Sequence, residues 1–139
     1  MSEAAGTDTV EFELVSPERL LKSEPVEMVV VPGAEGDFGV LPGHSLLIAT
    51  VRPGVIDIHE GGQVRESIFV AGGFAEVSDS RLTVLTEDAV PLDEIDRAGA
   101  EARLAEAREA VADAGDDRAK AEAERRVAIA EALVAAVGQ

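Results

Sequence analysis

The residues in this sequence that could do chemistry are two histidines and many carboxylates. His44 and His59 lie on different predicted elements, and no HExxH or calcium-loop spacing accompanies them. The 28 Asp and Glu residues offer pairs at almost every spacing, so no single pair is informative. No serine stands in the GxSxG pattern of hydrolases. The sequence therefore predicts no catalytic residue, cofactor or metal, and a small enzyme that uses scattered carboxylates stays a minor alternative.

The most unusual segment covers residues 32–44 and contains four glycines and two prolines. This composition predicts a sharply bent loop. Three apolar side chains are expected to anchor it: Phe38, Val40 and Leu41. The lysine and hydroxyl of a phosphate-binding loop are missing, and Glu35 and Asp37 would repel a phosphate. Two interpretations stay open: a structural connection between strands, or an acidic loop that docks on a polar or basic surface of another protein.

The overall charge narrows the choice of partners. Among 139 residues, 28 acidic side chains outnumber 12 basic ones, which gives a formal charge of −16 and a pI near 4.3. Such a field repels phosphate backbones and anionic lipid headgroups, so we expect neither nucleic-acid binding nor direct attachment to a membrane. The chain has no Cys, no apolar run near the roughly 20 residues of a membrane span, and an acidic N-terminus unlike a signal peptide. These features are typical of a soluble intracellular protein.

The elements that must position these residues change character near Pro91. Nearly all Gly, Pro, Phe and β-branched residues precede it, whereas Ala, Glu, Asp and Arg dominate after it. This contrast predicts a β domain at residues 1–90 and a helical domain at residues 91–139. Short apolar or alternating runs separated by turn residues favour a β-sandwich or small barrel. The predicted strands cover 10–14, 26–31, 46–51, 55–59, 64–70, 74–77 and 81–86.

The second part is predicted to be a helical hairpin that breaks at Gly115. Asp93 is the expected N-cap of the first helix, and Asp116 or Asp117 that of the second. The predicted apolar stripes are Ile95, Ala98, Ala102, Ala105 and Ala112 on the first helix, and Ala119, Ala123, Val127, Ala130 and Val134 on the second. Seams so rich in Ala bury little area, so both a rigid bracket and a mobile hairpin stay open.

The run from Gly36 to His44, with the sequence Gly-Asp-Phe-Gly-Val-Leu-Pro-Gly-His, resembles the epsilon subunit of F-type ATP synthases. Arg52-Pro53-Gly54 and the stretch 69–77, Phe-Val-Ala-Gly-Gly-Phe-Ala-Glu-Val, belong to the same resemblance. Together with the strand-rich first part and the Ala-rich helices, it spans essentially the whole chain.

The resemblance implies a flattened β-sandwich of about ten short strands, followed by two helices. It implies a non-catalytic subunit of the central stalk, which couples rotation of the c-subunit ring to ATP synthesis on the cytoplasmic side of the bacterial inner membrane. The partners would be the gamma subunit and the c ring, with the alpha and beta subunits reached through the helices. The c-ring contact maps onto Glu35, Asp37, Phe38 and His44.

Some members of this family bind ATP through a Leu/Ile-Asp-x-x-Arg-Ala motif in the first helix. Here an extra residue separates Asp93 from Arg97, which would rotate Arg97 by about 100° around a helix. We therefore expect no ATP binding. The helices still carry candidate regulatory cations that could act on hydrolysis: Arg97, Arg103, Arg125 and Arg126. A free-standing acidic binding module or assembly factor is the alternative function.

Overall fold

The structure is a computed structural model in which residues 9–138 are described. Ten strands precede two helices, so the prediction of a strand-rich first part and a helical hairpin is confirmed. The strands are β1 Val10–Val15, β2 Leu20–Val26, β3 Met28–Gly33, β4 Gly36–Val40, β5 Leu47–Val51, β6 Gly54–Glu60, β7 Gln63–Val70, β8 Gly73–Val77, β9 Arg81–Thr86 and β10 Ala89–Pro91. A short 3₁₀ turn, η1 (Leu92–Glu94), leads to α2 (Arg97–Asp113) and α3 (Asp117–Val137).

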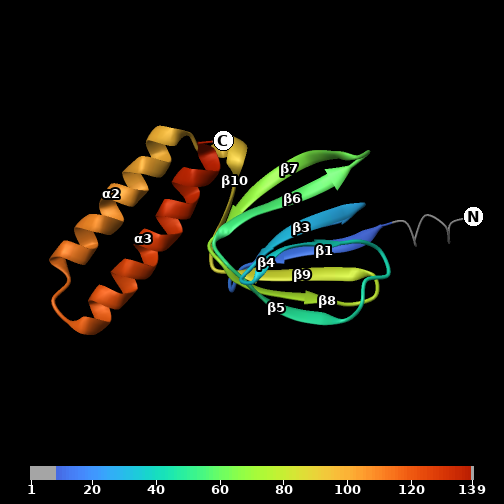
Figure 1. Ribbon diagram of the computed structural model, residues 1–139, viewed down its shortest axis with the longest axis horizontal. Coiled ribbons are helices and arrows are strands. Elements are labelled where there is room, and N and C mark those ends of the chain that lie inside the picture. Colours follow the sequence, from blue (N-terminus) through green and yellow to red (C-terminus); the bar gives the residue numbers. More distant parts are fainter. Residues whose placement is uncertain (1–8, 139) are drawn as a thin grey trace, which may run out of the picture. The chain divides into compact units, whose positions relative to one another are not determined.

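The strands form one curled sheet in the order β10-β7-β6-β3-β5-β8-β9-β1-β2, and β4 pairs with β3 (Figure 1). Alternate side chains of these strands point inward, because successive residues of a strand face opposite sides of the sheet. The core consists of buried Val, Leu and Ile residues, together with Phe12 and Ala75, from strands β1 to β9. The chain divides by its contacts into two compact units, one ending at Ala89 and the next beginning at Val90.

Ion pairs join the two ends of the sheet. Lys22 of β2 lies 3.0 Å from Glu66 of β7, and Arg65 of β7 binds the Glu24 carboxylate of β2. Desolvation lowers the pKa of Arg65, but its hydrogen bond to Glu24 and the charges of Glu24, Glu60 and Glu66 together raise that pKa above its ordinary value. Arg65 therefore stays cationic, and side chains link β2 to β7 where no backbone ladder does.

Three predictions about the first unit are corrected. Strand β2 was not predicted, and Val26 ends it: the chain bends at Glu27 before β3 begins. The segment 32–44 is not all loop, because β4 pairs with β3. Leu41 does not anchor this segment, since its side chain is 53% exposed, whereas Val40 is buried in the core.

The first helix begins later than predicted. Asp93 is not its N-cap, because residues 92–94 form the 3₁₀ turn and Ile95 is extended, with φ −137° and ψ 135°. Asp96 caps α2 instead: its side chain accepts a hydrogen bond from the Gly99 N–H at 2.8 Å. On α3 the Asp116 side chain accepts a hydrogen bond from the Ala119 N–H at 2.7 Å. Of the two residues predicted as the N-cap of this helix, Asp116 and Asp117, the structure therefore confirms Asp116.

The buried face of α2 also differs from the prediction. Ala98, Ala102, Ala105 and Ala112 are exposed, and Ala100 and Ala107 are buried instead. Alanines lie all around this helix, so the larger Leu104 and Val111, which are half-buried, mark the buried stripe. On α3, Ala123 and Ala130 are buried as predicted, together with Leu133. Neither helix of residues 9–138 has the length and apolar content that crossing a membrane requires.

Candidate protein-docking hairpin

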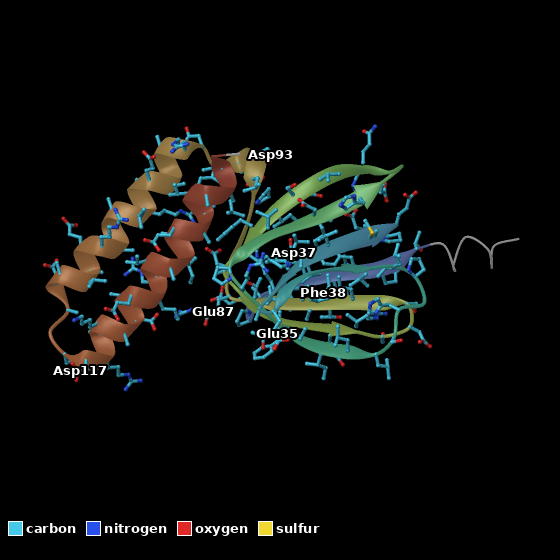
Figure 2. All side chains as sticks on the ribbon, viewed as in Figure 1. Glu35, Asp37, Phe38, Glu87, Asp93 and Asp117 are labelled. Atoms are coloured by element: carbon cyan, nitrogen blue, oxygen red, sulfur yellow. The ribbon has the colours of Figure 1, made fainter. Side chains whose placement is uncertain are left out.

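The candidate site is the hairpin formed by β3 and β4. The two strands pair from Val29–Val40 to Gly33–Gly36, which leaves Ala34 and Glu35 as the turn. Gly36 has φ 135°, a conformation that side chains rarely adopt, so glycine suits this end of the turn. Glu35 therefore lies exposed at the tip, and Asp37 follows on β4 (Figure 2).

Arg52, which follows β5, braces this hairpin. Its backbone N–H donates to the Pro32 carbonyl at 2.9 Å. Its guanidinium donates from Nη1 to the Gly33 carbonyl at 2.5 Å and from Nη2 to Oδ1 of Asp37 at 2.7 Å. One side chain thus contacts both strands of the hairpin, and Gly33 pairs with Val51 next to it.

The two predicted acidic residues consequently differ in availability. The Asp37 carboxylate is 59% exposed and already forms an ion pair with Arg52, whose side chain is 44% exposed. Within the described chain, Glu35 has no ion-pair partner. The tip therefore presents one unpaired carboxylate and one shared carboxylate to any partner.

The other two predicted contact residues have more structural surroundings. Phe38 is half-buried and packs against the core, so its ring supports β4. His44 is also half-buried, and its Nδ1 lies 2.9 Å from the Ser45 carbonyl. The preceding Gly43 N–H donates to the Asp79 carbonyl at 2.8 Å. Among residues 9–138, no hydrogen bond or ion pair joins His44 to Glu35 or Asp37.

A shallow groove of about 450 Å³ lies between the hairpin and β5. Its walls include Glu35 and Phe38 on one side and Leu47 and Ile48 on the other. Ile48 is 75% exposed, so the groove places an apolar surface next to the acidic tip. Such a groove can hold a protein loop. Its polar side chains are those of Glu35 and Thr50, and the described residues hold no cluster able to bind a metal.

A second exposed feature is an apolar row on the outer side of the sheet. Cross-strand pairing places Phe74 beside Leu85, Leu85 beside Val15, and Val15 beside Leu20. Phe74 is 58% exposed and Leu20 55% exposed, and Leu85 is exposed as well. Contiguous exposed apolar side chains mark interaction surfaces more often than scattered ones do. We call these four residues the apolar row.

The structure does not bring the four predicted helix cations together. Arg97 pairs with Glu101 at 3.1 Å, and Arg125 pairs with Glu122 at 3.1 Å. Arg103 lines a shallow pocket together with the carboxylates of the η1 region, and Arg126 is exposed on α3. Because η1 and the extended Ile95 separate Asp93 from α2, the two residues of the altered nucleotide motif do not share one helix. The argument from helical rotation is therefore wrong.

Arg52 and the apolar row are candidate site residues that the sequence did not predict. Arg52 stands in the Arg-Pro-Gly motif, but its reach to Asp37 depends on the pairing of Gly33 with Val51. The alternation of Phe74 with Ala75 gave a partial signal, since Ala75 is fully buried and Phe74 must then face outward.

Comparison with known proteins agrees with this architecture. Residues 9–92 match the family described as the β-sandwich domain of the ATP synthase delta/epsilon chain, which confirms the predicted sandwich. The chain is 59% identical to the ATP synthase epsilon chain of Paramagnetospirillum magneticum over 130 residues, covering 94% of this chain and 98% of the relative. It is 57% identical to the epsilon chain of Rhodospirillum rubrum over 129 residues, covering 93% and 96%.

A chain in the cryo-EM structure of the Euglena gracilis mitochondrial ATP synthase, comprising OSCP, F1 and c-ring, has a similar fold. The TM-score is 0.75 at 30% identity, with 92% of this chain and 81% of that chain covered.

Proposed function

The chain belongs to the ATP synthase epsilon-chain family, and from this premise we propose that it is a non-catalytic part of the central stalk. In this role it couples rotation of the c-subunit ring to ATP synthesis in the catalytic head. The 59% identity to an epsilon chain over 94% of the sequence does not favour a free-standing binding module or assembly factor. The chain would reach the cytoplasmic face of the bacterial inner membrane only through the complex, because its charge of −16 opposes direct contact with anionic lipid.

The β3–β4 hairpin is the observation that supports contact with the c ring. Its tip presents Glu35 unpaired and Asp37 half-neutralised, beside the apolar groove wall of Ile48. A polar loop with one or two basic side chains fits such a surface, since opposite charges steer docking and fix its register. Phe38 and His44 complete the proposed site as supports of β4 and of the segment after it.

The apolar row is the surface we assign to the gamma subunit. Exposing a row of four neighbouring apolar side chains, with more than half of Phe74 exposed, to water is unfavourable, and a partner that covers the row lowers the free energy. Strand pairing spreads this row over β8, β9, β1 and β2, so a long partner element could lie across it. The second unit, with Arg97, Arg103, Arg125 and Arg126, is the proposed regulatory part, through which the alpha and beta subunits would be contacted.

Native mass spectrometry of the complex that copurifies with this chain tests the proposal. We expect one copy of the chain per assembly, together with gamma and three alpha–beta pairs. Recovery of the chain only alone, or only with unrelated proteins, would remove the proposal.

A Phe74→Asp variant tests the gamma assignment. It should leave the free chain folded, because the side chain is exposed, but should lower the amount of copurified gamma. Val64→Asp is the matched control, since Val64 is 49% exposed and lies on β7, which carries no residue of the apolar row. Equal gamma recovery with both variants would contradict the assignment.

A further inference from the structure

The contacts of Arg52 go beyond an ordinary surface ion pair. Its backbone N–H is bonded to the Pro32 carbonyl, and its guanidinium reaches the Gly33 carbonyl and Oδ1 of Asp37. A further bond runs from Ala34 N–H to the Thr50 carbonyl at 2.8 Å. The last residues of β3 and the first of β4 are thus both attached to the end of β5.

This attachment matters because β4 lies off the main order of the sheet, where its strand partner is β3. Val40 and Phe38 hold β4 to the core, whereas Gly36 and Asp37 next to the turn are exposed. A guanidinium is planar and carries donors in a fixed fork, so it can hold two acceptors at once. Arg52 uses this property to hold a carbonyl of β3 and a carboxylate of β4 in one arrangement.

The same arrangement leaves Asp37 able to bind a second cation. An ionised carboxylate has two oxygens with about four acceptor positions. Within the described chain only Oδ1 of Asp37 has a partner, and the side chain is 59% exposed. Its other oxygen, Oδ2, can accept a hydrogen bond from a basic group of a docking loop while Arg52 keeps the first.

We propose that Arg52 is a positioning residue for the c-ring contact, holding Asp37 as a bridge between itself and one basic side chain of the partner loop. This inference rests on the proposed function and assigns the partner chemistry: a loop with a single guanidinium or ammonium group near the turn. Arg52 acts through Asp37 and Gly33 and does not itself touch the partner.

Rebinding of full-length variants to ATP synthase depleted of this chain measures the effect. Arg52→Gln and Asp37→Asn are each expected to weaken binding by roughly tenfold, the range of one interfacial charge contact. The double variant should be no weaker than the worse single variant, because both changes remove the same bridge. Arg52→Lys should recover part of the affinity, since it restores the charge but not the fork.

Arg65→Gln is the matched control. Like Arg52, Arg65 forms an ion pair near the surface, in its case with Glu24. It lies at the β6–β7 hairpin. There His59 of β6 pairs with Met28, which is at the other end of β3 from Gly33. Arg65→Gln should lower thermal stability without changing affinity. An Arg52→Gln variant that loses thermal stability but keeps its affinity, as this control is expected to do, would overturn the positioning role, and so would losses that multiply in the double variant.

A Glu35→Gln variant distinguishes failure of the proposed c-ring contact from failure of the positioning role of Arg52. If Glu35→Gln and Asp37→Asn both bind as tightly as the unchanged chain, the hairpin does not contact the ring and the proposed function of this site fails. If both weaken binding while Arg52→Gln does not, only the positioning role of Arg52 is overturned. Should Arg52→Gln not fold, the comparison of Asp37→Asn with Asp37→Glu tests the bridge, since lengthening a bridging carboxylate should also weaken binding.

Discussion

Charge reversal at the hairpin should affect stability differently at Asp37 and Glu35, two carboxylates that look equivalent in the sequence. Asp37→Arg is expected to destabilise the free chain, whereas Glu35→Arg is expected to be nearly neutral. The reason is that Asp37 forms an ion pair with Arg52 at 2.7 Å, while Glu35 lies at the tip with no ion-pair partner in the described chain. Both variants keep the same change in net charge, so each serves as the control for the other.

The magnitude follows from the exposure of the pair. Its side chains are 44% and 59% exposed, and ion pairs in such positions contribute about 0.2–1 kcal/mol. Asp37→Arg removes this attraction and adds a repulsion of similar size, so it should cost about 0.4–2 kcal/mol. For a unit of this size each kcal/mol lowers Tm by roughly 4–8 °C. Glu35→Arg should stay within about 0.5 kcal/mol.

Thermal unfolding at low and high salt measures both costs. The difference between the two variants should shrink at high salt, because screening weakens the repulsion between exposed charges. The double variant Asp37→Arg with Arg52→Asp restores an ion pair of reversed direction and should recover part of the lost stability. Equal Tm values for Asp37→Arg and Glu35→Arg at low salt would refute the assignment of the Arg52 brace.

Three further predictions concern the fold. Gly73→Ala should cost more than about 4 kcal/mol in denaturant unfolding, because Gly73 has φ 141° and a Cβ there would lie 1.8 Å from the Leu85 carbonyl oxygen; a mild effect would contradict this close approach. Asp96→Ala should lower the stability of the helical unit by the value of one N-cap, about 1 kcal/mol, and so lower the melting temperature of its helical signal, while Asp93→Ala should not. A chain that ends at Ala89 should unfold cooperatively in far-UV circular dichroism, since the buried core residues lie on strands β1 to β9 and Ala89, which packs against them, is retained; a non-cooperative transition would contradict an independent β unit.

The sequence predicted most strands because their buried residues alternate or run together between turns. It missed β2, whose polar Lys-Ser-Glu-Pro centre lies at an edge of the sheet and buries only Val26 completely. It missed β4 because three glycines near that strand favour a loop by local propensity. Pairing with β3 overrides this propensity, and such pairing depends on residues distant from the strand itself.

The helix start shows a second limit of local patterns. Asp93 and Asp96 both suit an N-cap, and each is followed by residues able to form a helix. The choice is made by Pro91 and Ile95, which bound a 3₁₀ turn with extended backbone on either side. The buried face of α2 was equally open, because small alanines surround the helix and only Leu104 and Val111 distinguish one side.

The sequence could least predict which carboxylates form ion pairs within the chain and which are left for a partner. With 28 acidic and 12 basic residues, most carboxylates cannot have a basic partner of their own, and the chemistry of the surface depends on which ones do. Composition treats Glu35 and Asp37 alike. The register that pairs Gly33 with Val51 brings Arg52 to Asp37 across a sequence separation of 15, and leaves Glu35 alone at the turn. A hairpin that carries one braced carboxylate and one unpaired carboxylate can hold its shape and still attract a cation, which suits the docking contact that we propose for it.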